Sequence, residues 1–397
     1  MFPKLRFKEF DENWKEVTLK NCITSIDSGW SPQCESYPAN SSEWGVLKTT
    51  SVDWSGFNSS FNKKLPLELT PRKEIEVKPL DILVTRAGPT ERVGVVSVVP
   101  HSVRSKLMIS DKLIRLKSNE ENNPLFLGIS LSSVKCQNQL QSKTSGLAKS
   151  QTNISQKILG EVLLKLPSKE EQTKIASFLS AVDEKISQLT KKHELLSQYK
   201  QGMMQKLFSQ QIRFKADDGS EFGEWENILV KEIFDVTRGQ VLAVSNTVSV
   251  ADTDYKYPVF SSQTKQKGLM GFYKKYLFED ALTWTTDGAN AGDVNFRKGK
   301  FYCTNVCGVL LSKKGYANLC IAEILNKVTH KYVSYVGNPK LMNNVMSEIP
   351  ITIPSNLEEQ TKIANFLSSI DQKIEVVAQQ IEQAKQWKKG LLQNMFI

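Results

Sequence analysis

The chain has 397 residues, 40% of them hydrophobic, which excludes a disordered or fibrous protein and leaves room for two or three domains. Its 52 basic and 42 acidic residues give a net charge of +10, which favours a polyanionic partner, nucleic acid before a membrane surface. No apolar run is long enough to cross a bilayer, and the N-terminus lacks the apolar core of a signal peptide, so we expect a cytoplasmic protein.

Residues 1–165 are predicted to form a first globular domain that is mostly strand. Short β-rich runs are separated by Gly, Pro and Asn, as in a sheet with tight turns. The four clearest runs are 46–48, 82–84, 93–99 and 112–116. A helix is expected near 124–136, and the polar run 137–156 predicts a surface loop.

A long helix is predicted within 166–210, opening with the heptapeptide EEQTKIA at residues 170–176. From Ile175 to Leu207, seam residues recur at alternating spacings of four and three, which is the pattern of a coiled coil. The two glutamates in the first turn suit the positive end of the helix dipole.

The same heptapeptide returns letter for letter at 358–364, and the two copies stay in register to residues 208 and 396. The second copy predicts a second long helix within 353–397. Two stripes in the same register are natural mates, so we expect the helices to pair as an antiparallel coiled coil. The alternative is that each helix buries its stripe on a separate core.

Residues 211–352 are predicted to form a second globular domain. It opens as the first does, because IRFK at 212–215 repeats LRFK at 5–8 and a tryptophan follows each segment. Strand candidates are 257–260, 271–273, 282–285 and 307–311, and a helix is expected over 321–335. Strands dominate both domains and a helix comes late in each. The predicted class is therefore α+β, with two mixed β-rich domains separated by two long helices.

Catalytic motifs are missing from the sequence. It has neither the Asn/Asp-Pro-Pro-aromatic tetrapeptide of a methyltransferase nor the G-x4-G-K-[ST] loop of an ATPase. Cys303 and Cys307 have no second pair and no nearby histidine, so we expect reduced thiols and no metal. For the enzyme alternative, a stand-alone nuclease or methyltransferase, there is only the fragment Glu76-Val77-Lys78.

The chain resembles the specificity subunit of type I restriction–modification systems over its whole length. The marks are the two EEQTKIA copies, each followed two residues later by Phe-Leu, and the opening Leu-Arg-Phe ahead of a tryptophan. The first domain adds DILVTR at 81–86 and RVG at 92–94. The second adds SSQ at 261–263, GLMGF at 268–272 and TDG at 286–288.

The resemblance implies a non-catalytic, sequence-specific DNA-binding subunit with a bipartite target. Each globular domain would read one half of the target, and the paired helices would set the spacer and dock two modification subunits. Those subunits would bring S-adenosylmethionine and methylate adenine N6, and restriction subunits would add cleavage that depends on ATP and Mg. This chain itself would hold no cofactor. The alternative from the interaction class is a coiled-coil scaffold that binds no DNA.

Recognition of DNA needs Lys and Arg for phosphates, and Arg, Lys, Asn, Gln, Ser or Thr for base edges. In the first domain the expected contacts are Trp30, Lys48, Thr49, Thr50, Arg86, Thr90, Arg92, Lys143, Thr144, Ser145, Lys149 and Ser150. In the second domain they are Arg238, Ser261, Ser262, Gln263, Thr264, Lys265, Lys267, Thr285, Thr286, Asn290, Arg297 and Lys340.

A separate set of residues is expected to contact the modification subunits. They come from the two heptapeptide copies and the phenylalanine after each: Gln172, Lys174, Phe178, Gln360, Lys362 and Phe366. The two phenylalanines lie one position before the helix seam. They could touch a partner, or equally pack back on the adjacent domain.

Overall fold

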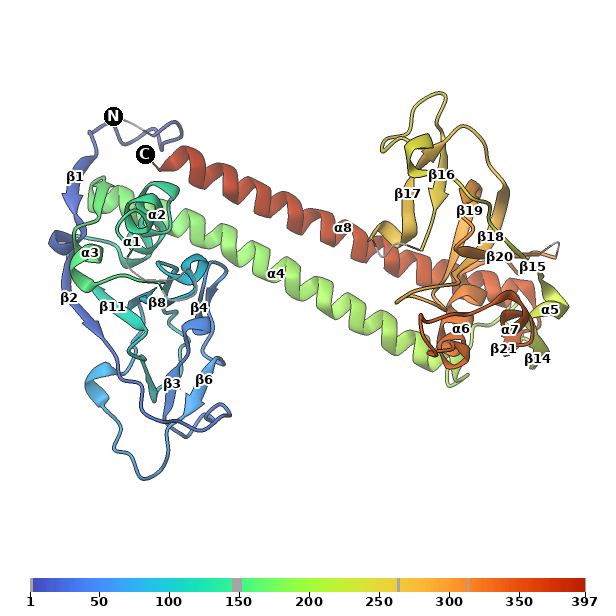
Figure 1. The fold of residues 1–397 in the computed structure, drawn as a ribbon, viewed down its shortest axis with the longest axis horizontal. Coiled ribbons are helices and arrows are strands. Elements are labelled where there is room, and N and C mark those ends of the chain that lie inside the picture. The colour runs from blue at the N-terminus through green and yellow to red at the C-terminus, as the bar shows by residue number, and fades with distance from the viewer. Residues whose placement is uncertain (1–2, 145–151, 263–264, 313, 397) are drawn as a thin grey trace. The chain divides into compact units, whose positions relative to one another are not determined.

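The structure, a computed structural model, describes residues 3–144, 152–262, 265–312 and 314–396 (Figure 1). Contacts divide the chain into two compact units. The first contains Met1–Leu189 together with Gln380–Ile397, and the second is Thr190–Gln379. Each unit therefore combines one β-rich domain with a part of both long helices.

The first unit contains two main sheets. An antiparallel four-stranded sheet has the order β2 (Ile23–Ser28), β11 (Leu113–Ser118), β7 (Ile82–Thr85) and β9 (Val96–Val98). A three-stranded sheet has the order β10 (Leu107–Met108), β3 (Gly45–Leu47) and β6 (Asn62–Lys64). Two small pairs are β4 (Val52–Asp53) with β5 (Gly56–Phe57), and β8 (Ala87–Gly88) with β12 (Thr152–Asn153).

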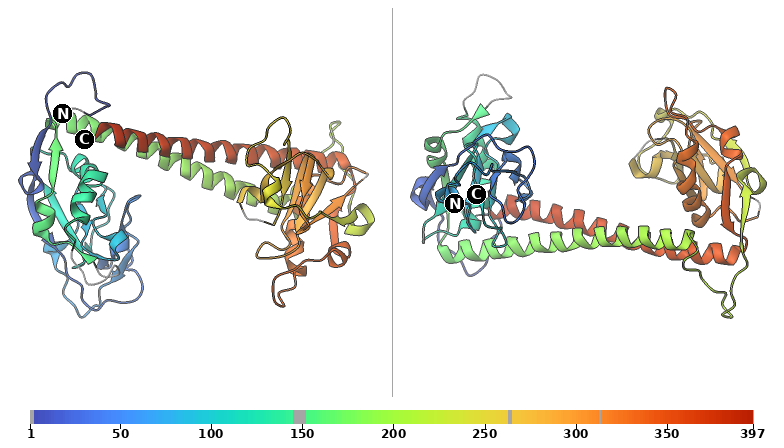
Figure 2. Two further views of the ribbon diagram at one scale, coloured as in Figure 1. Left: turned by 45° about the horizontal axis from the view of Figure 1, so that its top comes forward. Right: turned by 90° about the horizontal axis from the view of Figure 1, so that it is seen from below.

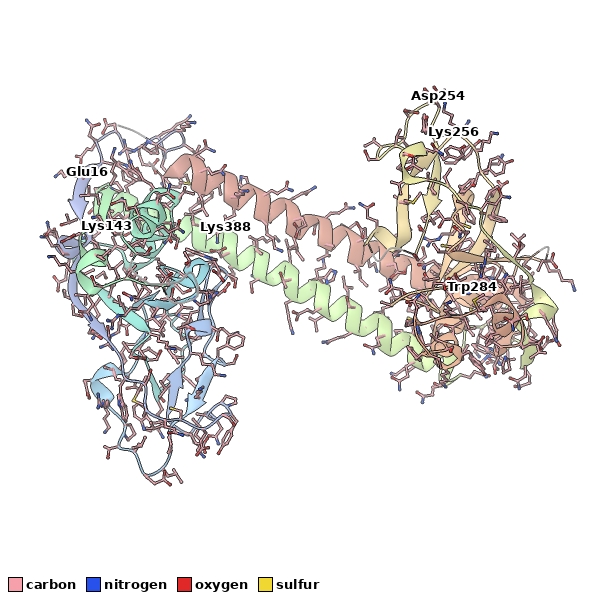
Figure 3. All side chains as sticks on the ribbon, in the orientation of Figure 1. Glu16, Lys143, Asp254, Lys256, Trp284 and Lys388 are labelled. Carbon is pink, nitrogen blue, oxygen red and sulfur yellow. The ribbon has the colours of Figure 1, made fainter. Side chains whose placement is uncertain are left out.

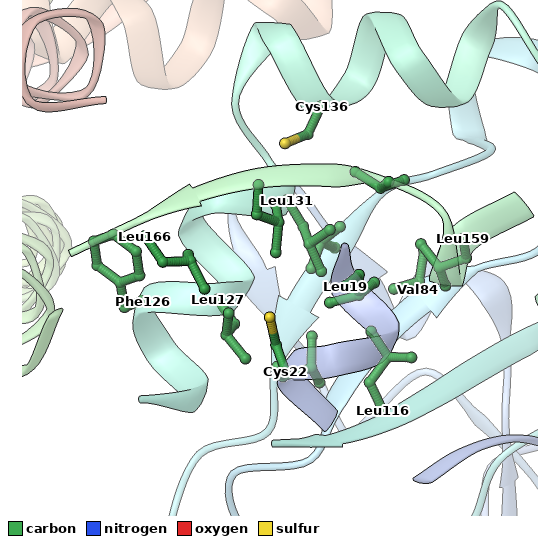
Figure 4. Close-up of a cluster of buried hydrophobic side chains, with 14 of the residues drawn as sticks. Leu19, Cys22, Val84, Leu116, Phe126, Leu127, Leu131, Cys136, Leu159 and Leu166 are labelled. Carbon is green, nitrogen blue, oxygen red and sulfur yellow. The ribbon is translucent and has the colours of Figure 1, made fainter. Parts of the chain in front are cut away.

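The core of the first domain lies where its helices meet the four-stranded sheet. The helices are α1 (Pro124–Leu131), α2 (Val134–Gln141) and α3 (Gln156–Gly160). Asn123 caps α1 by accepting hydrogen bonds from the backbone N–H groups of Leu125 and Phe126. Apolar side chains from α1 and the strands then pack together (Figure 4). Phe126 lies among them and has no exposed surface.

The second unit contains one six-stranded sheet. Its order is β15 (Asp235–Arg238), β20 (Cys307–Leu311), β18 (Phe278–Thr285), β19 (Val294–Cys303), β16 (Tyr257–Phe260) and β17 (Leu269–Tyr273). Its α-helices, apart from the long ones, are α5 (Val230–Ile233), α6 (Leu319–Val328) and α7 (Asn343–Ser347). Trp284 of β18 is 1% exposed and donates from Nε1 to the carbonyl of Leu341 at 3.0 Å, inside the core (Figure 3).

The chain enters and leaves each β-rich domain through a two-stranded antiparallel sheet, which we call the neck. The first neck pairs β1 (Lys15–Thr18) with β13 (Leu163–Leu166). The second neck pairs β14 (Trp225–Leu229) with β21 (Pro350–Pro354). The last strand of each neck leads directly into a long helix, so each helix starts at a fixed place on its own domain.

The long helices are α4 (Lys169–Phe208) and α8 (Leu357–Met395). In the first unit the start of α4 lies beside the end of α8 (Figure 2). There Lys388 Nζ is 2.5 Å from Asp183 Oδ1. In the second unit the end of α4 lies beside the start of α8, and Lys200 Nζ is 2.8 Å from Asp371 Oδ1. The repeat aligns Lys200 with Lys388 and Asp183 with Asp371, so one antiparallel pairing occurs in both units.

The predicted class, α+β with two β-rich domains and two long helices that pair antiparallel, is confirmed. Every seam position of the 4-3 pattern, from Ile175 to Leu207 and from Ile363 to Met395, is buried or half-buried. Seam side chains of the two helices also share one cluster in each unit, Leu179 with Leu391 in the first and Leu207 with Leu367 in the second. The alternative that each helix buries its stripe on a separate core is therefore wrong.

Two local predictions are wrong. The expected helix 124–136 is two helices, because the chain turns at Ser132 and the hydroxyl of Ser133 caps α2. The expected loop 137–156 begins inside α2, whose buried Cys136 and Leu140 share one face. Residues 145–151 lie outside the described part of the chain.

Short 3₁₀ turns connect the elements of both domains. They are η1 (Leu19–Cys22), η2 (Thr49–Ser51), η3 (Lys73–Ile75), η4 (Thr90–Arg92), η5 (Val244–Asn246) and η7 (Thr329–Tyr332). The segment η6 (Lys265–Gly268) is not a regular 3₁₀ turn, because Gln266 and Lys267 have positive φ.

Candidate nucleic-acid interface

The second glutamate of each heptapeptide copy is buried and binds an arginine from the start of its own half. Glu171, 1% exposed, accepts hydrogen bonds from Arg6 Nε at 2.8 Å and Nη2 at 2.7 Å. Glu359, also 1% exposed, accepts from Arg213 at 3.0 and 2.8 Å. Such two-pronged pairs are the strong form of this interaction, and the glutamate hydrogen bonds raise the pKa of both arginines. We call each pair a clamp.

Two more contacts accompany each clamp. A lysine of the heptapeptide pairs with an acidic residue near the opening segment, and a phenylalanine packs edge-on against the phenylalanine of LRFK or IRFK. The four pairs are Lys174–Glu9, Lys362–Asp217, Phe178–Phe7 and Phe366–Phe214. The sequence left two options open for the phenylalanines, and the structure packs both on their own domain's opening segment. Phe178 also meets Trp387 of α8, which is 54% exposed.

The two heptapeptide glutamines are held inside the fold. Gln172 and Gln360 are 2% and 0% exposed, and their Nε2 atoms donate to the carbonyls of Pro167 and Pro354. Gln172 Oε1 also accepts a hydrogen bond from the backbone N–H of Asn123, which caps α1. Gln360 Oε1 accepts one from Nδ2 of Asn318, which caps α6. A side chain buried in this way offers no surface to a partner, so we remove both glutamines from the expected subunit contacts.

Two of the DNA contacts expected in the first domain line one pocket of about 260 Å³. Lys48 and Thr49 lie there together with Lys63 and Lys112, which we did not select from the sequence. The signals that could have indicated these two lysines are the pair Lys63-Lys64 within a strand and the position of Lys112 just before a strand. In a chain with 52 basic residues such signals do not distinguish a site lysine from any other.

Two other expected contacts of the first domain interact with their own domain. Arg92 Nη1 is 2.5 Å from Asp53 Oδ2, and its Nη2 donates to the carbonyls of Thr49 and Val52. The Arg72 guanidinium lies over the Trp30 ring, 4.1 Å from its centroid. Arg92 therefore braces the turn that follows Lys48, whereas Trp30 presents only part of its surface.

The remaining candidates of this domain are spread over its surface. Thr50 is exposed and Arg86 is half-buried. The Thr90 hydroxyl lies 2.8 Å from that of Thr152, Lys143 is 4.0 Å from Glu161, and Thr144 donates to the Gln141 carbonyl. Ser145, Lys149 and Ser150 lie outside the described residues.

Five of the DNA contacts expected in the second domain line a second pocket, of about 210 Å³. They are Ser261, Lys267, Thr285, Asn290 and Arg297. Thr283, Asp293 and Asn295 add to its polar lining and were not selected from the sequence. Asp293 directly precedes β19 and Asn295 lies near its start, and the sequence did not predict this strand. This pocket therefore offers both hydrogen-bond donors and acceptors.

Arg297 is the most deeply placed of these residues, at 8% exposed. Its Nε donates to Thr283 Oγ1 at 3.0 Å, its Nη2 donates to the Lys267 carbonyl at 2.7 Å, and its guanidinium lies 3.8 Å from the Phe260 ring centroid. Burial lowers the pKa of Arg297 to about 10, so it remains charged at neutral pH.

The other candidates of the second domain fall into three groups. Thr286 is fully buried and donates to the Val306 carbonyl, so it serves the fold. Arg238 and Ser262 are half-buried, and Lys340 is exposed. Gln263 and Thr264 lie outside the described residues, as does the side chain of Lys265.

The cysteines of the second domain are buried thiols. Cys303 and Cys307 are free, and burial raises the pKa of the Cys307 thiol to about 11. Across the described ranges no three His, Cys, Asp or Glu side chains gather as a metal site would require. Within the same ranges, no helix combines the length and apolar character of a bilayer crossing.

Comparison with known proteins gives consistent matches. The model of the type I restriction modification DNA specificity domain matches residues 12–197 and 223–386. The EcoEI specificity subunit of Escherichia coli is 40% identical over 171 residues, 43% of this chain but only 29% of that subunit. The MjaVIII specificity subunit of Methanocaldococcus jannaschii is 26% identical over 356 residues, 81% of this chain and 79% of that one.

A solved structure has the same fold. The type I restriction–modification S subunit from M. genitalium aligns with a TM-score of 0.69, covering 100% of this chain and 99% of that chain. The sequences are 18% identical, so this likeness concerns the fold alone.

Two unlike β-rich domains, each clamped to a copy of one helix, define a modular binding protein. The family match covers both halves, and the chain therefore belongs to the type I restriction–modification DNA specificity family. Its homologues are specificity subunits, which are the non-catalytic DNA-recognition subunits of their complexes. The resemblance seen in the sequence is confirmed.

Proposed function

We propose that this protein directs a cytoplasmic type I restriction–modification complex to a bipartite DNA sequence. Residues 1–165 would read one half of the target and residues 211–352 the other. The observation that supports this most is the contrast between the two halves: the necks, clamps and helices repeat, whereas the sheets that they carry differ. Two different sheets carried by the same necks and helices are suited to recognising two different short DNA sequences at a set separation.

In this proposal the paired helices set the spacer and dock two modification subunits. In the first unit, the exposed ring of Trp387 beside Phe178, together with Lys174, forms an expected contact surface in place of the buried glutamines. In the second unit, Lys362 and Phe366 form the corresponding one. The modification subunits would supply S-adenosylmethionine for adenine N6 methylation. Restriction subunits would supply cleavage that depends on ATP and Mg.

The proposal predicts a specific loss of DNA methylation. When the gene is deleted, one interrupted, asymmetric N6-methyladenine motif should fall from near-complete methylation to background. Single-molecule sequencing of the host genome with and without the gene measures this, and the intact gene on a plasmid should restore the motif. If co-expression with the modification subunits in a host without this methylation produces no new motif, the proposal is wrong.

A domain exchange tests the division of labour. Replacing residues 1–165 by the corresponding segment of another specificity subunit should change one half of the methylated motif and leave the other half and the spacer unchanged. The reciprocal exchange of 211–352 is the matched control and should change the opposite half. A change in both halves from either exchange would contradict independent reading by the two domains.

A further inference from the structure

The pocket of about 260 Å³ in the first domain is lined by side chains from separate parts of the chain. Lys48 and Thr49 follow β3, Lys63 lies in β6, and Lys112 directly precedes β11. The register of β3 with β6 places Val46 opposite Lys63, and Lys48 lies two residues beyond Val46 on the same face, so Lys48 and Lys63 are diagonal neighbours. The fold thus brings three lysines to the lining of one small pocket.

The charge of this pocket is not balanced by its own lining. The lining residues include three lysines and no carboxylate. Among the described contacts none of these three ammonium groups takes part in an ion pair, whereas the neighbouring Lys64 is 2.7 Å from Glu43. Like charges around one space repel each other, and a bound anion would remove that repulsion.

A buried hydroxyl of the same lining also lacks a partner. Ser110 is 6% exposed, and within the described part of the chain its Oγ has no hydrogen-bond partner. Buried polar groups in folded proteins are nearly always paired, so such a group calls for an explanation. Its Oγ has less than 1 Å² of accessible surface, so an anion would reach this hydroxyl only after the neighbouring side chains of the lining shift.

We infer that this pocket binds one phosphate group of the DNA backbone, an inference that rests on the proposed function. A phosphate offers only acceptors and negative charge, which matches three lysines with serine and threonine hydroxyls. A base edge carries donors as well as acceptors, which suits the second domain's pocket with its Asp293 and Asn290. The pocket in the first domain therefore positions the DNA, and its neighbours read the sequence.

The salt dependence of DNA binding by the full chain tests this inference. Each phosphate that a protein neutralises adds about one to the slope of log K against log salt. Replacing Lys48, Lys63 and Lys112 together by alanine should lower the slope by about one, because the three lysines serve one phosphate. Binding to a random duplex is sufficient for this measurement, since the contact is independent of sequence.

A charge-matched variant provides the control. Lys15, Lys20 and Lys157 are exposed lysines of the same unit that do not line the pocket. Their triple alanine variant should keep the slope of the unaltered protein. The single variant Lys63→Gln, at an exposed position of the pocket rim, guards against misfolding and should reduce affinity in the same direction.

The outcomes separate the two proposals. If the unaltered protein binds with a steep slope and both triple variants keep it, or both lose it equally, the phosphate site is wrong while DNA recognition stands. If inorganic phosphate slows amide hydrogen exchange around the pocket in the unaltered protein only, but the pocket variant keeps its slope on DNA, the pocket takes free anions and the inference is overturned. If the unaltered protein binds no duplex even at low salt, the proposed function itself fails.

Discussion

Replacing Glu171 by alanine is expected to destabilise the first unit by about 3 kcal/mol, at the lower end for breaking a buried ion pair, because it removes the carboxylate that faces the Arg6 guanidinium. Arg6 is 11% exposed, both oxygens of Glu171 accept hydrogen bonds from its guanidinium, and the same guanidinium also donates to the Glu12 carbonyl at 2.7 Å. The lost stability should concern the contact between the opening segment that carries Arg6 and the start of α4.

Glu170→Ala is the matched control for this change. Glu170 precedes Glu171 in the same turn of α4 and is exposed, so its removal changes the net charge identically and should alter stability by only about 0.5 kcal/mol. The two units need not unfold together, so a single melting temperature is a poor readout. Hydrogen exchange of the amides at the start of α4 reports the local effect. Equal exchange rates in the two variants would show that the clamp does not hold the helix to its domain.

The second large effect is expected at Gly308, which faces Trp284 in the central strand pair of the second domain. A Cβ at Gly308 would lie 2.1 Å from Cη2 and Cζ2 of the Trp284 ring. The ring cannot move aside without losing its hydrogen bond to the Leu341 carbonyl. Overpacking of a core costs about 1–3 kcal/mol, and so close a contact places Gly308→Ala at the upper end, at about 3 kcal/mol.

Gly223→Ala serves as the control, because its Cβ would meet nothing closer than Ser355 Oγ at 3.7 Å and should leave stability nearly unchanged. The double variant Gly308→Ala with Trp284→Leu should be less destabilised than the sum of its single variants, since the second change makes room for the first. Denaturant unfolding of the second unit measures both effects. If the destabilisation of the double variant equals the sum of the two single variants, contact with the Trp284 ring is not the reason for a glycine at position 308.

For function, Gly308→Ala should affect one half of the target. Only the second domain is disturbed, so the proposal expects methylation to lose its dependence on one half of the motif, or to fall altogether, while the first domain stays folded. Hydrogen exchange in the four-stranded sheet of the first domain should remain as in the unaltered protein.

The long helices could be predicted because their information is local. A 4-3 pattern needs only neighbouring turns, and repetition of the heptapeptide gave the second helix at once. The strand β19 escaped prediction for a local reason too. Its sequence VNFRKGKFYC carries basic residues at its centre, and the register of β18 and β19 shifts between Glu279 and Ala281, so no clean alternation is visible.

The candidate site was harder to predict because side-chain burial depends on distant partners. Glu170 and Glu171 are neighbouring glutamates of one turn, and the partners that cover Glu171, Arg6 and Trp14, lie 165 and 157 residues away. Gln172 and Gln360 were expected at a surface for the same reason. Their repetition in the two heptapeptides indicates a shared role, but it does not show whether that role is packing or binding. Lys63 joins Lys48 through the pairing of β6 with β3, whereas Lys112 comes from just before β11 in the four-stranded sheet.

The two necks also bear on how much the β-rich domains can vary in size. The two strands of a neck are paired, so the β-rich domain between them begins and ends at neighbouring points. In its effect on the helices, that domain is equivalent to a loop with fixed ends. The entropic cost of closing a flexible loop grows slowly, by about 0.6 kcal/mol for each doubling of its length. The same helices can therefore carry a four-stranded sheet on one neck and a six-stranded sheet on the other. Insertions between the neck strands should cost the helix pair little, whereas a single-residue slip within a neck would misplace the helix that follows it.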